Sequence, residues 1–241
     1  MKSFCSRGKV GDAMTSLRYS IRRQHVDVFF RRQAETFAAG ARVLDLGGTK
    51  IDKRGTFDLD RYNLAVVYAN LGAEKQPDVQ SDAAQLPFAP QSFDLVICGE
   101  LLEHVQNPVP VLAQVWRVLR PGGRLLISVP FLYHIHGDPY DYGRYTDHYW
   151  LEQLAAAGYA PVMIERHGLF FSVLLDMGKQ FLNRKVRRPW RWFLPPLLDR
   201  LQRAAERYEA QSHVQADPFI RSYTTGFGIV ATKPTHGGRA G

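Results

Sequence analysis

The sequence is poor in cysteine and contains no long apolar run. Its 241 residues include only Cys5 and Cys98, which excludes a disulfide framework and a cysteine-based zinc site and favours a reducing compartment. No apolar run approaches the about 20 residues that a membrane-spanning helix needs. The first sixteen residues also lack the apolar centre of a signal peptide. We therefore expect a cytoplasmic protein.

Repeats, low-complexity segments and two common nucleotide-binding motifs are also missing. The chain has neither the phosphate-binding pattern of Gly, four residues and Gly-Lys-Ser/Thr, nor the dinucleotide pattern G-x-G-x-x-G. What is present is an ordinary globular composition, with 45% hydrophobic residues. This length and composition indicate one domain with an elaboration rather than two complete domains.

Positive charge is concentrated at the two ends of the chain. The net charge is +8, and residues 1–42 carry nine Lys or Arg against three acids, as residues 166–207 carry ten against three. Residues 43–165 reverse the balance, with nine basic residues and fifteen acids. The basic flanks are either solvated helix faces or surfaces for an anionic partner, such as lipid headgroups, a phosphate-bearing acceptor or nucleic acid.

The most informative stretch is a short apolar strand that ends in a pair of glycines. Val43, Leu44 and Leu46 predict a buried strand that contains Asp45, and Gly47-Gly48 predict a sharp turn after it. Glycine lets the backbone approach a ligand closely, and ligands of open α/β sheets bind at the carboxyl ends of strands. The pattern therefore indicates a ligand site, and an ordinary strand-to-turn transition is the alternative.

Apolar strand runs alternate with helical patterns along most of the chain. We expect strands at residues 64–68, 95–98, 125–129 and 162–166, and helices at residues 16–39, 109–119 and 147–157. Arg120-Pro121-Gly122-Gly123 is expected to end the second of these helices. This alternation predicts βαβ units and a parallel sheet.

Four segments together resemble class I S-adenosylmethionine-dependent methyltransferases, and in particular the group that acts on small molecules. They are D-x-G-G at residues 45–48, D-A-x-x-L-P-F at 82–88 followed by S-F-D-L-V at 92–96, L-E-H at 102–104, and V-L-R-P-G-G-R-L-L-I-S-V-P at 118–130. The resemblance extends over residues 43–146. It implies an α/β, Rossmann-like three-layer sandwich. Its seven-stranded sheet would be mostly parallel, with an antiparallel last strand at residues 222–233 and a helical insertion before it.

The resemblance also implies a cofactor, S-adenosylmethionine, which leaves as S-adenosylhomocysteine. Negative charge at Asp45 and Glu100 would lie near the sulfonium and the methionine ammonium, and Asp82 would accept a hydrogen bond from the adenine amine, unless it only caps a turn. Two departures from the family stand out, because Thr49-Lys50 replace a third glycine and Asn70 replaces a ribose-binding acid. The implied cofactor-binding residues are Asp45, Leu46, Gly47, Gly48, Asn70, Leu71, Asp82, Ala83, Cys98, Gly99 and Glu100.

Residues 130–146 hold an unusual density of histidine, aspartate and tyrosine, similar to a run in bacterial methyltransferases often suspected of acting on glycans. We hypothesise an acceptor pocket in which His136 accepts a proton and Tyr133, Tyr142 and Arg144 shape the site. One alternative is a metal site of His134, His136 and Asp138. Another is a structural network in which Arg144 pairs with Asp138 or Asp141. His104 is a second proton-acceptor candidate, or a histidine fixed by hydrogen bonds at a helix end.

A long excursion separates the last two strands. Residues 167–221 include a basic, tryptophan-containing segment at 184–198, which is typical either of a helical lid or of a segment that contacts a membrane surface. Contact with nucleic acid is the third reading. We expect a single domain, with a helical cap at residues 1–41, a cofactor-binding core at 42–166, the insertion at 167–221 and the last strand within 222–235.

The predicted activity is methyl transfer to oxygen or nitrogen of a small-molecule, glycan or lipid-linked acceptor, with a place in polysaccharide biosynthesis. A methyltransferase-like scaffold that has lost cofactor binding and an RNA methyltransferase are the alternatives. Asp138-Pro139-Tyr140 is one proline short of the D-P-P-Y motif of adenine N-methyltransferases and follows the wrong strand, which argues against base methylation. The sequence does not fix the oligomeric state. It allows peripheral attachment at the inner membrane surface.

Overall fold

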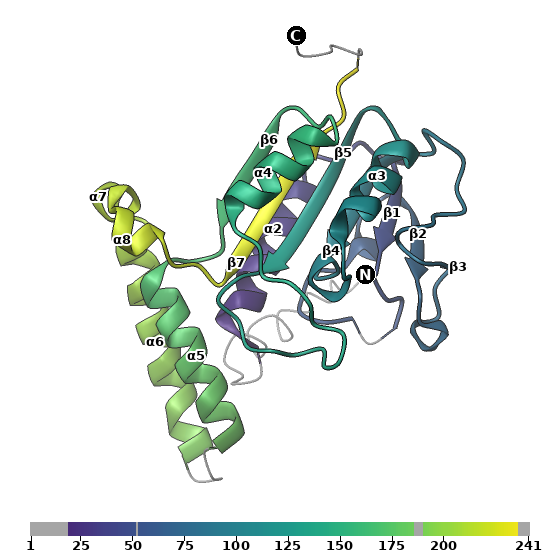
Figure 1. The fold of residues 1–241 in the computed structure, drawn as a ribbon. Coiled ribbons are helices and arrows are strands. Elements are labelled where there is room, and N and C mark those ends of the chain that lie inside the picture. Colours follow the sequence, from purple (N-terminus) through teal and green to yellow (C-terminus); the bar gives the residue numbers. More distant parts are fainter. Residues whose placement is uncertain (1–18, 52, 186–189, 236–241) are drawn as a thin grey trace, which may run out of the picture. The chain divides into compact units, whose positions relative to one another are not determined.

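The computed structural model describes residues 19–51, 53–185 and 190–235, without the side chains of 190–193 (Figure 1). Cys5, the first residues of the helix expected at 16–39, and part of the basic segment at 184–198 lie outside the described residues. The chain divides into two compact units. Unit 1 comprises residues 1–30, 54–57 and 167–225, and unit 2 comprises residues 31–53, 58–166 and 226–241.

Unit 2 is built on a seven-stranded sheet with the order β3-β2-β1-β4-β5-β7-β6 (Figure 1). Strands β1 to β5 pair in parallel, whereas β7 is antiparallel to both β5 and β6. This arrangement confirms the predicted Rossmann-like α/β fold and its antiparallel last strand. The strands are β1 Arg42–Leu46, β2 Ala65–Asn70, β3 Val79–Gln80, β4 Phe93–Gly99, β5 Leu119–Pro130, β6 Val162–Arg166 and β7 Gly226–Thr232.

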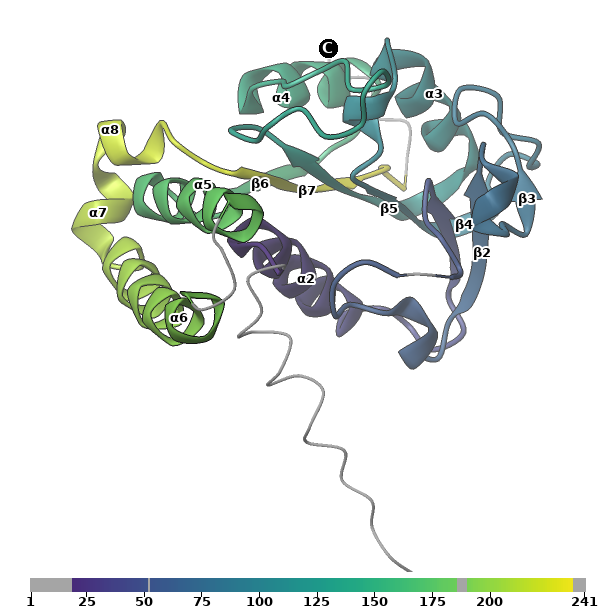
Figure 2. The same cartoon turned by 90° about the horizontal axis from the view of Figure 1, so that it is seen from below.

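Helices α3 (Pro108–Val118) and α4 (Asp147–Ala156) cover one face of this sheet (Figure 2). Asn107 and Thr146 cap their N-termini, because each side chain accepts a hydrogen bond from a backbone N–H of the first turn. Apolar side chains of the strands and of α3 form the core, and most are fully buried. Three short 3₁₀ helices, η1 (Leu59–Arg61), η2 (Ala73–Lys75) and η3 (Leu102–His104), lie in the connections.

Strand β5 begins six residues earlier than the apolar run at 125–129 indicates. Leu119 both ends α3, by donating its N–H to Val115, and pairs with Phe93 of β4. The register then shifts, so that Arg124 pairs with Leu95. Residues 120–123 therefore form a bulge inside the strand rather than a loop in front of it.

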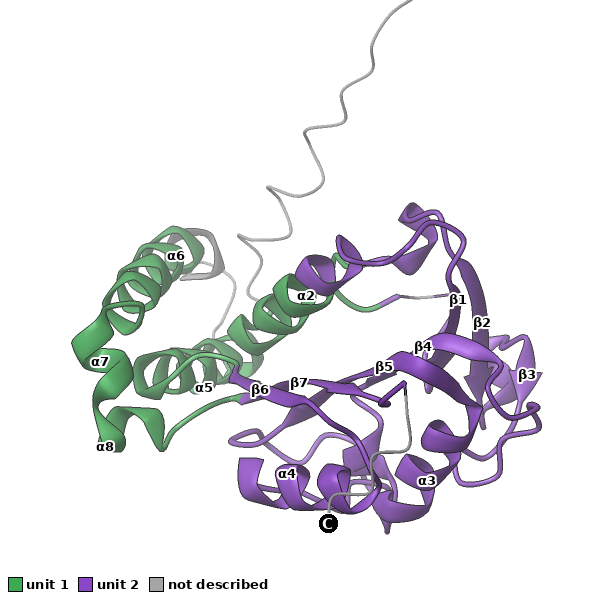
Figure 3. Ribbon diagram, turned by 90° about the horizontal axis from the view of Figure 1, so that it is seen from above, with its two compact units in different colours: residues 1–30, 54–57, 167–225 green, residues 31–53, 58–166, 226–241 purple. Residues whose placement is uncertain are grey.

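Unit 1 is helical (Figure 3). Buried carboxylates fix its helix ends, because Asp176 accepts hydrogen bonds from the N–H groups of Ile21 and Arg22 at 2.7 and 3.2 Å, and Glu209 accepts from Leu169 and Ser172 at 3.0 and 2.8 Å. Such contacts satisfy N–H groups that a helix leaves open. The helices are α2 Ile21–Ala34, of which the residues after Phe30 belong to unit 2, and α5 Phe170–Lys185, α6 Trp190–Glu209, α7 Ser212–Ala216 and α8 Pro218–Arg221.

Two further elements differ in their bounds from the sequence prediction. Helix α2 covers residues 21–34 of the expected 16–39, since the chain turns after Ala34. The last strand begins at Gly226 rather than at Ser222, because the Ser222 N–H bonds to carbonyls of α8 and extends that helical turn. No described helix has the length and apolar character needed to span a bilayer.

Candidate functional site

The glycine pair after β1 brings bare backbone next to an acid. Gly47 has a φ of +83°, which favours glycine, and its N–H bonds to the carbonyl of Ala69 on β2 at 2.8 Å. A Cβ atom on Gly48 would lie 2.2 Å from the Asp45 carboxylate. Neither position therefore accepts a side chain without rearrangement.

The Asn70 carboxamide holds this turn in place. Its Nδ2 donates to the carbonyls of Gly47 and Gly48, both at 2.9 Å, and its Oδ1 accepts from the Gly72 N–H at 3.0 Å. An acid could not make the two donated bonds, since an ionised carboxylate only accepts. The departure from the family at this position thus has a structural use: Asn70 ties β2 to the glycine turn.

The other departure, Thr49-Lys50, ties the same turn to the far edge of the sheet. Lys50 pairs with the Asp78 carboxylate, whose other oxygen accepts from the Tyr68 N–H at 2.9 Å. The hydrogen bond from Lys50 holds the pKa of Asp78 below its ordinary value. Lys50, one of the two residues at the position of the family's third glycine, therefore forms an ion pair with Asp78, which precedes β3.

Asp82 and Ala83 follow β3, beside Asn70. The Ser81 N–H bonds to the Asn70 carbonyl at 3.1 Å, and Asp82 accepts from the Ala84 N–H at 2.8 Å in a side-chain turn. The turn-capping use of Asp82 is thus present, and the carboxylate keeps further acceptor positions. Ala83 is buried, and Leu71 is exposed.

The end of β4 carries a strained acid held by a serine that the sequence analysis missed. Glu100 has a φ of +58°, which is uncommon outside glycine, and its N–H bonds to the Ser128 carbonyl at 2.8 Å. The Ser128 hydroxyl donates to Glu100 Oε1 at 2.6 Å. Ser128 is a polar residue in an otherwise apolar predicted strand, and this could have marked it as a site residue. Before Glu100 come Gly99 and the fully buried Cys98, whose thiol pKa is raised by burial and further by Asp45.

The residue after Glu100 connects the glycine turn to the histidines. A Cβ atom on Gly47 would lie 2.9 Å from the side chain of Leu101, so the turn packs directly against the segment that enters η3. Glu103 and His104 lie on η3. The turn and these two side chains therefore occupy adjacent positions at the carboxyl edge of the sheet.

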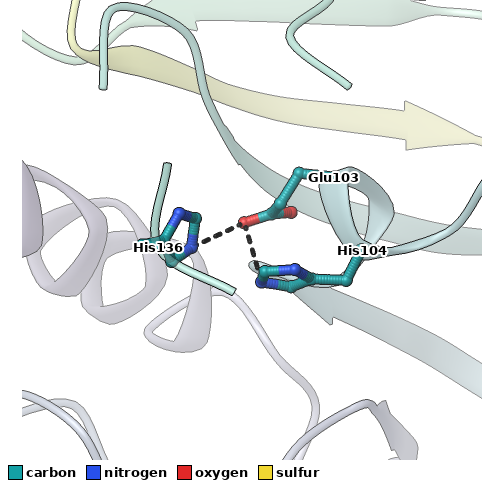
Figure 4. Close-up of side chains that lie close together, drawn as sticks. All are labelled: Glu103, His104 and His136. Carbon is teal, nitrogen blue, oxygen red and sulfur yellow. Dashed lines mark ion pairs between the residues drawn. The ribbon is translucent and has the colours of Figure 1, made fainter. Parts of the chain in front are cut away.

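Glu103, His104 and His136 come together (Figure 4). The buried Glu103 carboxylate lies between the two imidazoles, with 3.8 Å from its Oε1 to Nε2 of each histidine. The two rings pack edge to face, 4.9 Å between centroids. Among the described residues, these three alone bring His, Cys, Asp or Glu ligand atoms close enough for one metal ion. The alternative set of His134, His136 and Asp138 does not.

Asp141 fixes the position of His136. It accepts from the His136 backbone N–H at 2.9 Å and lies 3.2 Å from the ring Nδ1. The Arg144 guanidinium grips the same carboxylate with two nitrogens, at 2.5 and 2.8 Å, and this pairing holds the pKa of Asp141 well below its usual range. Of the two partners expected for Arg144, the structure selects Asp141.

The two tyrosines of the predicted acceptor site make different contacts. The Tyr133 ring packs edge to face against His136, 5.4 Å between centroids. The Tyr142 N–H bonds to the Glu103 carbonyl at 2.8 Å, and its side chain is exposed. Of the predicted residues of loop 131–146, His136 and Tyr142 therefore contact η3 through Glu103, which was not among the predicted site residues.

Comparison with known proteins finds methyltransferases. Residues 55–127 match a protein family described as a methyltransferase domain. The demethylmenaquinone methyltransferase of Mycobacterium sp. (strain KMS) is 41% identical over 115 residues, which cover 42% of this chain and 48% of that protein. The chain spans less than half of the length of the first curated relatives that it matches.

Solved structures share the fold. Phosphoethanolamine N-methyltransferase 2 of Haemonchus contortus, solved with phosphomonomethylethanolamine and S-adenosylhomocysteine, aligns with a TM-score of 0.54 at 18% identity, over 86% of this chain and 52% of that one. An S-adenosylmethionine-dependent methyltransferase of Archaeoglobus fulgidus aligns with a TM-score of 0.53 at 15% identity, over 88% and 94%. The similarities confirm the predicted resemblance and the predicted fold.

Proposed function

We propose that this chain, a class I S-adenosylmethionine-dependent methyltransferase by its family match and its fold, transfers a methyl group to oxygen or nitrogen of a small-molecule acceptor. The observation that carries the proposal is the Gly47-Gly48 turn beside Asp45, which is held by Asn70 and packed against the segment that leads to His104. The relative named as a demethylmenaquinone methyltransferase supports a small-molecule acceptor.

The residues at the carboxyl edge suit a cationic nucleoside. Asp45 and Glu100 supply negative charge at the ends of neighbouring strands, and Gly47 and Gly48 expose backbone. Asp82 retains acceptor positions for an amine. S-adenosylmethionine, when bound, supplies a methyl group already activated by its positive sulfur. The protein then has to align the acceptor with that group and exclude water, which is orientation work.

An acceptor hydroxyl or ammonium must also lose a proton, and His136 is the proposed group that receives it. Its Nδ1 contacts Asp141 at 3.2 Å and Arg144 at 3.4 Å, and its Nε2 is the nitrogen proposed to accept the proton. Arg144 acts through Asp141 and is a positioning residue in this scheme. Tyr133 packs against the imidazole and limits its rotation.

Calorimetric titration of the purified chain with S-adenosylmethionine and S-adenosylhomocysteine tests the proposal. We expect saturable binding of both, with about one molecule per chain, and a rise in melting temperature. Neither heat nor a thermal shift with either nucleoside would favour the scaffold alternative. A His136→Ala variant should lose turnover and keep its affinity for S-adenosylhomocysteine.

The basic, apolar hairpin of unit 1 supports a second proposal, contact with an anionic membrane surface. Phe171 of α5 and Tyr208 of α6 pack edge to face, 5.4 Å between ring centroids, so the exposed apolar residues of the two helices meet at one end of the pair. Exposed Arg184 and Lys185 end α5. Apolar side chains beside cations match the acyl boundary and headgroups of anionic lipid. The exposed apolar residues are Phe171, Leu174, Met177, Phe181, Leu197, Leu201 and Tyr208.

Co-sedimentation with lipid vesicles tests this contact. We expect the chain to sediment with vesicles rich in phosphatidylglycerol and not with pure phosphatidylcholine vesicles, and Phe181→Asp should weaken the binding. Leu151→Asp, at an exposed apolar position on α4, is the matched control. Equal binding by both variants would contradict the proposal. Retention of RNA at low salt would instead favour the RNA methyltransferase alternative.

A further inference from the structure

Three side chains from two separate segments direct ligand atoms at one point. Glu103 and His104 come from η3, and His136 comes from the loop after β5. Their ligand atoms all lie within 4.8 Å of one another. The 3.8 Å from Glu103 Oε1 to each imidazole Nε2 is too long for a hydrogen bond. It is close to the separation of about 3.4 Å that two ligands have around a tetrahedral ion with bonds of about 2.1 Å.

Both imidazoles are oriented as metal ligands. His104 Nδ1 lies 2.6 Å from the carbonyl of Tyr140, an atom that can only accept, so Nδ1 carries the proton. His136 Nδ1 lies 3.2 Å from the Asp141 carboxylate and 3.4 Å from an Arg144 nitrogen, so its supporting contacts are at Nδ1 and its Nε2 is the nitrogen nearest Glu103. Each Nε2 therefore faces the Glu103 carboxylate, 3.8 Å away. A carbonyl or carboxylate on the far nitrogen is the usual support of a metal-bound histidine.

The two segments are clamped together around this point. Glu103 accepts a hydrogen bond at its backbone carbonyl from the Tyr142 N–H, 2.8 Å away. Gly137 lets the loop approach His104 closely, because a Cβ atom there would lie 2.5 Å from His104 Cε1. Arg144 holds Asp141 with two nitrogens. The three ligands are thus arranged by backbone and supporting contacts before any ion arrives.

We infer that Glu103, His104 and His136 bind one divalent transition-metal ion, with Zn²⁺ as the best match. Two imidazole nitrogens and one carboxylate are a donor set of catalytic zinc sites, which leave the fourth position for water or substrate. The Glu103 carboxylate is almost fully buried, so it supplies negative charge where an ion would be shielded from solvent.

The inference deepens the proposed function and depends on it for the role of the ion. An acceptor hydroxyl in the fourth position would have its pKa lowered, so that its O–H bond breaks and the proton leaves to water. His136 would then act as a ligand and not as the base. The two roles of its Nε2 exclude each other, which makes them separable by experiment.

Metal titration of an untagged, EDTA-treated full-length chain is the test. We expect calorimetry to show one Zn²⁺ bound per chain, and Co²⁺ to give the visible absorption of a tetrahedral nitrogen-oxygen site. Glu103→Gln and His136→Ala should each weaken Zn²⁺ binding at least about 100-fold, since even a supporting residue typically contributes 10- to 100-fold. Asp141→Asn should weaken it about 10- to 100-fold.

His148→Ala, which removes an exposed histidine of α4, is the matched control and should bind Zn²⁺ as the unmodified chain does. Near-ultraviolet circular dichroism confirms that each variant is folded. Affinity of Glu103→Gln equal to that of the unmodified chain, or absence of Zn²⁺ binding by the unmodified chain, would overturn the inference. Binding of S-adenosylhomocysteine by the EDTA-treated chain tests the proposed function separately, because the residues proposed to bind the nucleoside do not include the three ligands.

Discussion

Replacement of Asn70 by aspartate tests whether this position mainly binds ribose or mainly holds the glycine turn. The family resemblance places an acid here to bind ribose, so Asn70→Asp would restore a missing contact and tighten nucleoside binding. The structure indicates the opposite. An aspartate would turn the donor that lies 2.9 Å from the carbonyls of Gly47 and Gly48 into an oxygen, and three acceptor oxygens would then face one another.

The expected loss in free energy of unfolding follows from the two hydrogen bonds that Asn70→Asp removes. Each hydrogen bond contributes about 1 kcal/mol net, so the two donated bonds account for about 2 kcal/mol. The bond from the Gly72 N–H to Oδ1 remains. For a chain of this size, about 2 kcal/mol corresponds to a fall of about 4–8 °C in melting temperature. Displacement of the glycine turn should also weaken S-adenosylhomocysteine binding at least tenfold, or about 1.4 kcal/mol.

Thermal unfolding and calorimetric titration measure the two effects. Gln80→Glu is the matched control, because it also converts a carboxamide into a carboxylate and removes one donated bond, from Nε2 to the Leu71 carbonyl at 2.9 Å, on exposed chain. Its free energy of unfolding should change by less than about 0.5 kcal/mol. An Asn70→Asp variant that melts with the parent and binds S-adenosylhomocysteine more tightly would refute this reasoning.

Three further predictions concern the same half of the chain. Gly48→Ala should abolish detectable S-adenosylhomocysteine binding in calorimetry, since its Cβ would meet the Asp45 carboxylate at 2.2 Å, whereas Gly178→Ala, with open space around it, should bind normally. With the other cysteine replaced by serine, Cys98 should react with Ellman's reagent at pH 8 only after denaturation, because it is fully buried and its thiol pKa is raised; fast native labelling would disprove this. The lowered pKa of Asp78 means that its ion pair stabilises the fold above the ordinary carboxyl pKa and that this contribution is lost as the pH falls through the folded value. Urea unfolding of Asp78→Asn should therefore lose less stability between pH 5 and pH 3 than the parent.

Much of the sheet could be predicted because its strands are apolar and short. Val43, Leu44 and Leu46 are buried as expected, and the strand at 162–166 has the predicted bounds. What failed depended on distant contacts. The start of α2 is set by Asp176, which lies 155 residues away from Ile21 in the sequence, and no local pattern encodes such a cap.

The candidate site shows the same division. The motifs identified the glycine turn and the histidine-containing loop 131–146, because glycine pairs and clustered histidines are uncommon in segments that only support the fold. They could not identify Glu103 as the residue between the histidines, since an acid in L-E-H is as compatible with an exposed helix start as with burial. Its position depends on the approach of loop 131–146, which Gly137 permits. Nor could the motifs show that the Asn70 side chain donates its hydrogen bonds to the backbone carbonyls of Gly47 and Gly48.

The place of β7 in the sheet has a consequence for how the chain is made. Strand β7, the last of these seven strands in the sequence, pairs with both β5 and β6, so it fills an inner position and not an edge. Until a ribosome has released residues 226–232, two older strands have open hydrogen-bonding sides, which favour self-association. Premature termination before this point would therefore yield an aggregating product rather than a smaller active one, and any fusion partner is better tolerated beyond residue 235 than within the final strand.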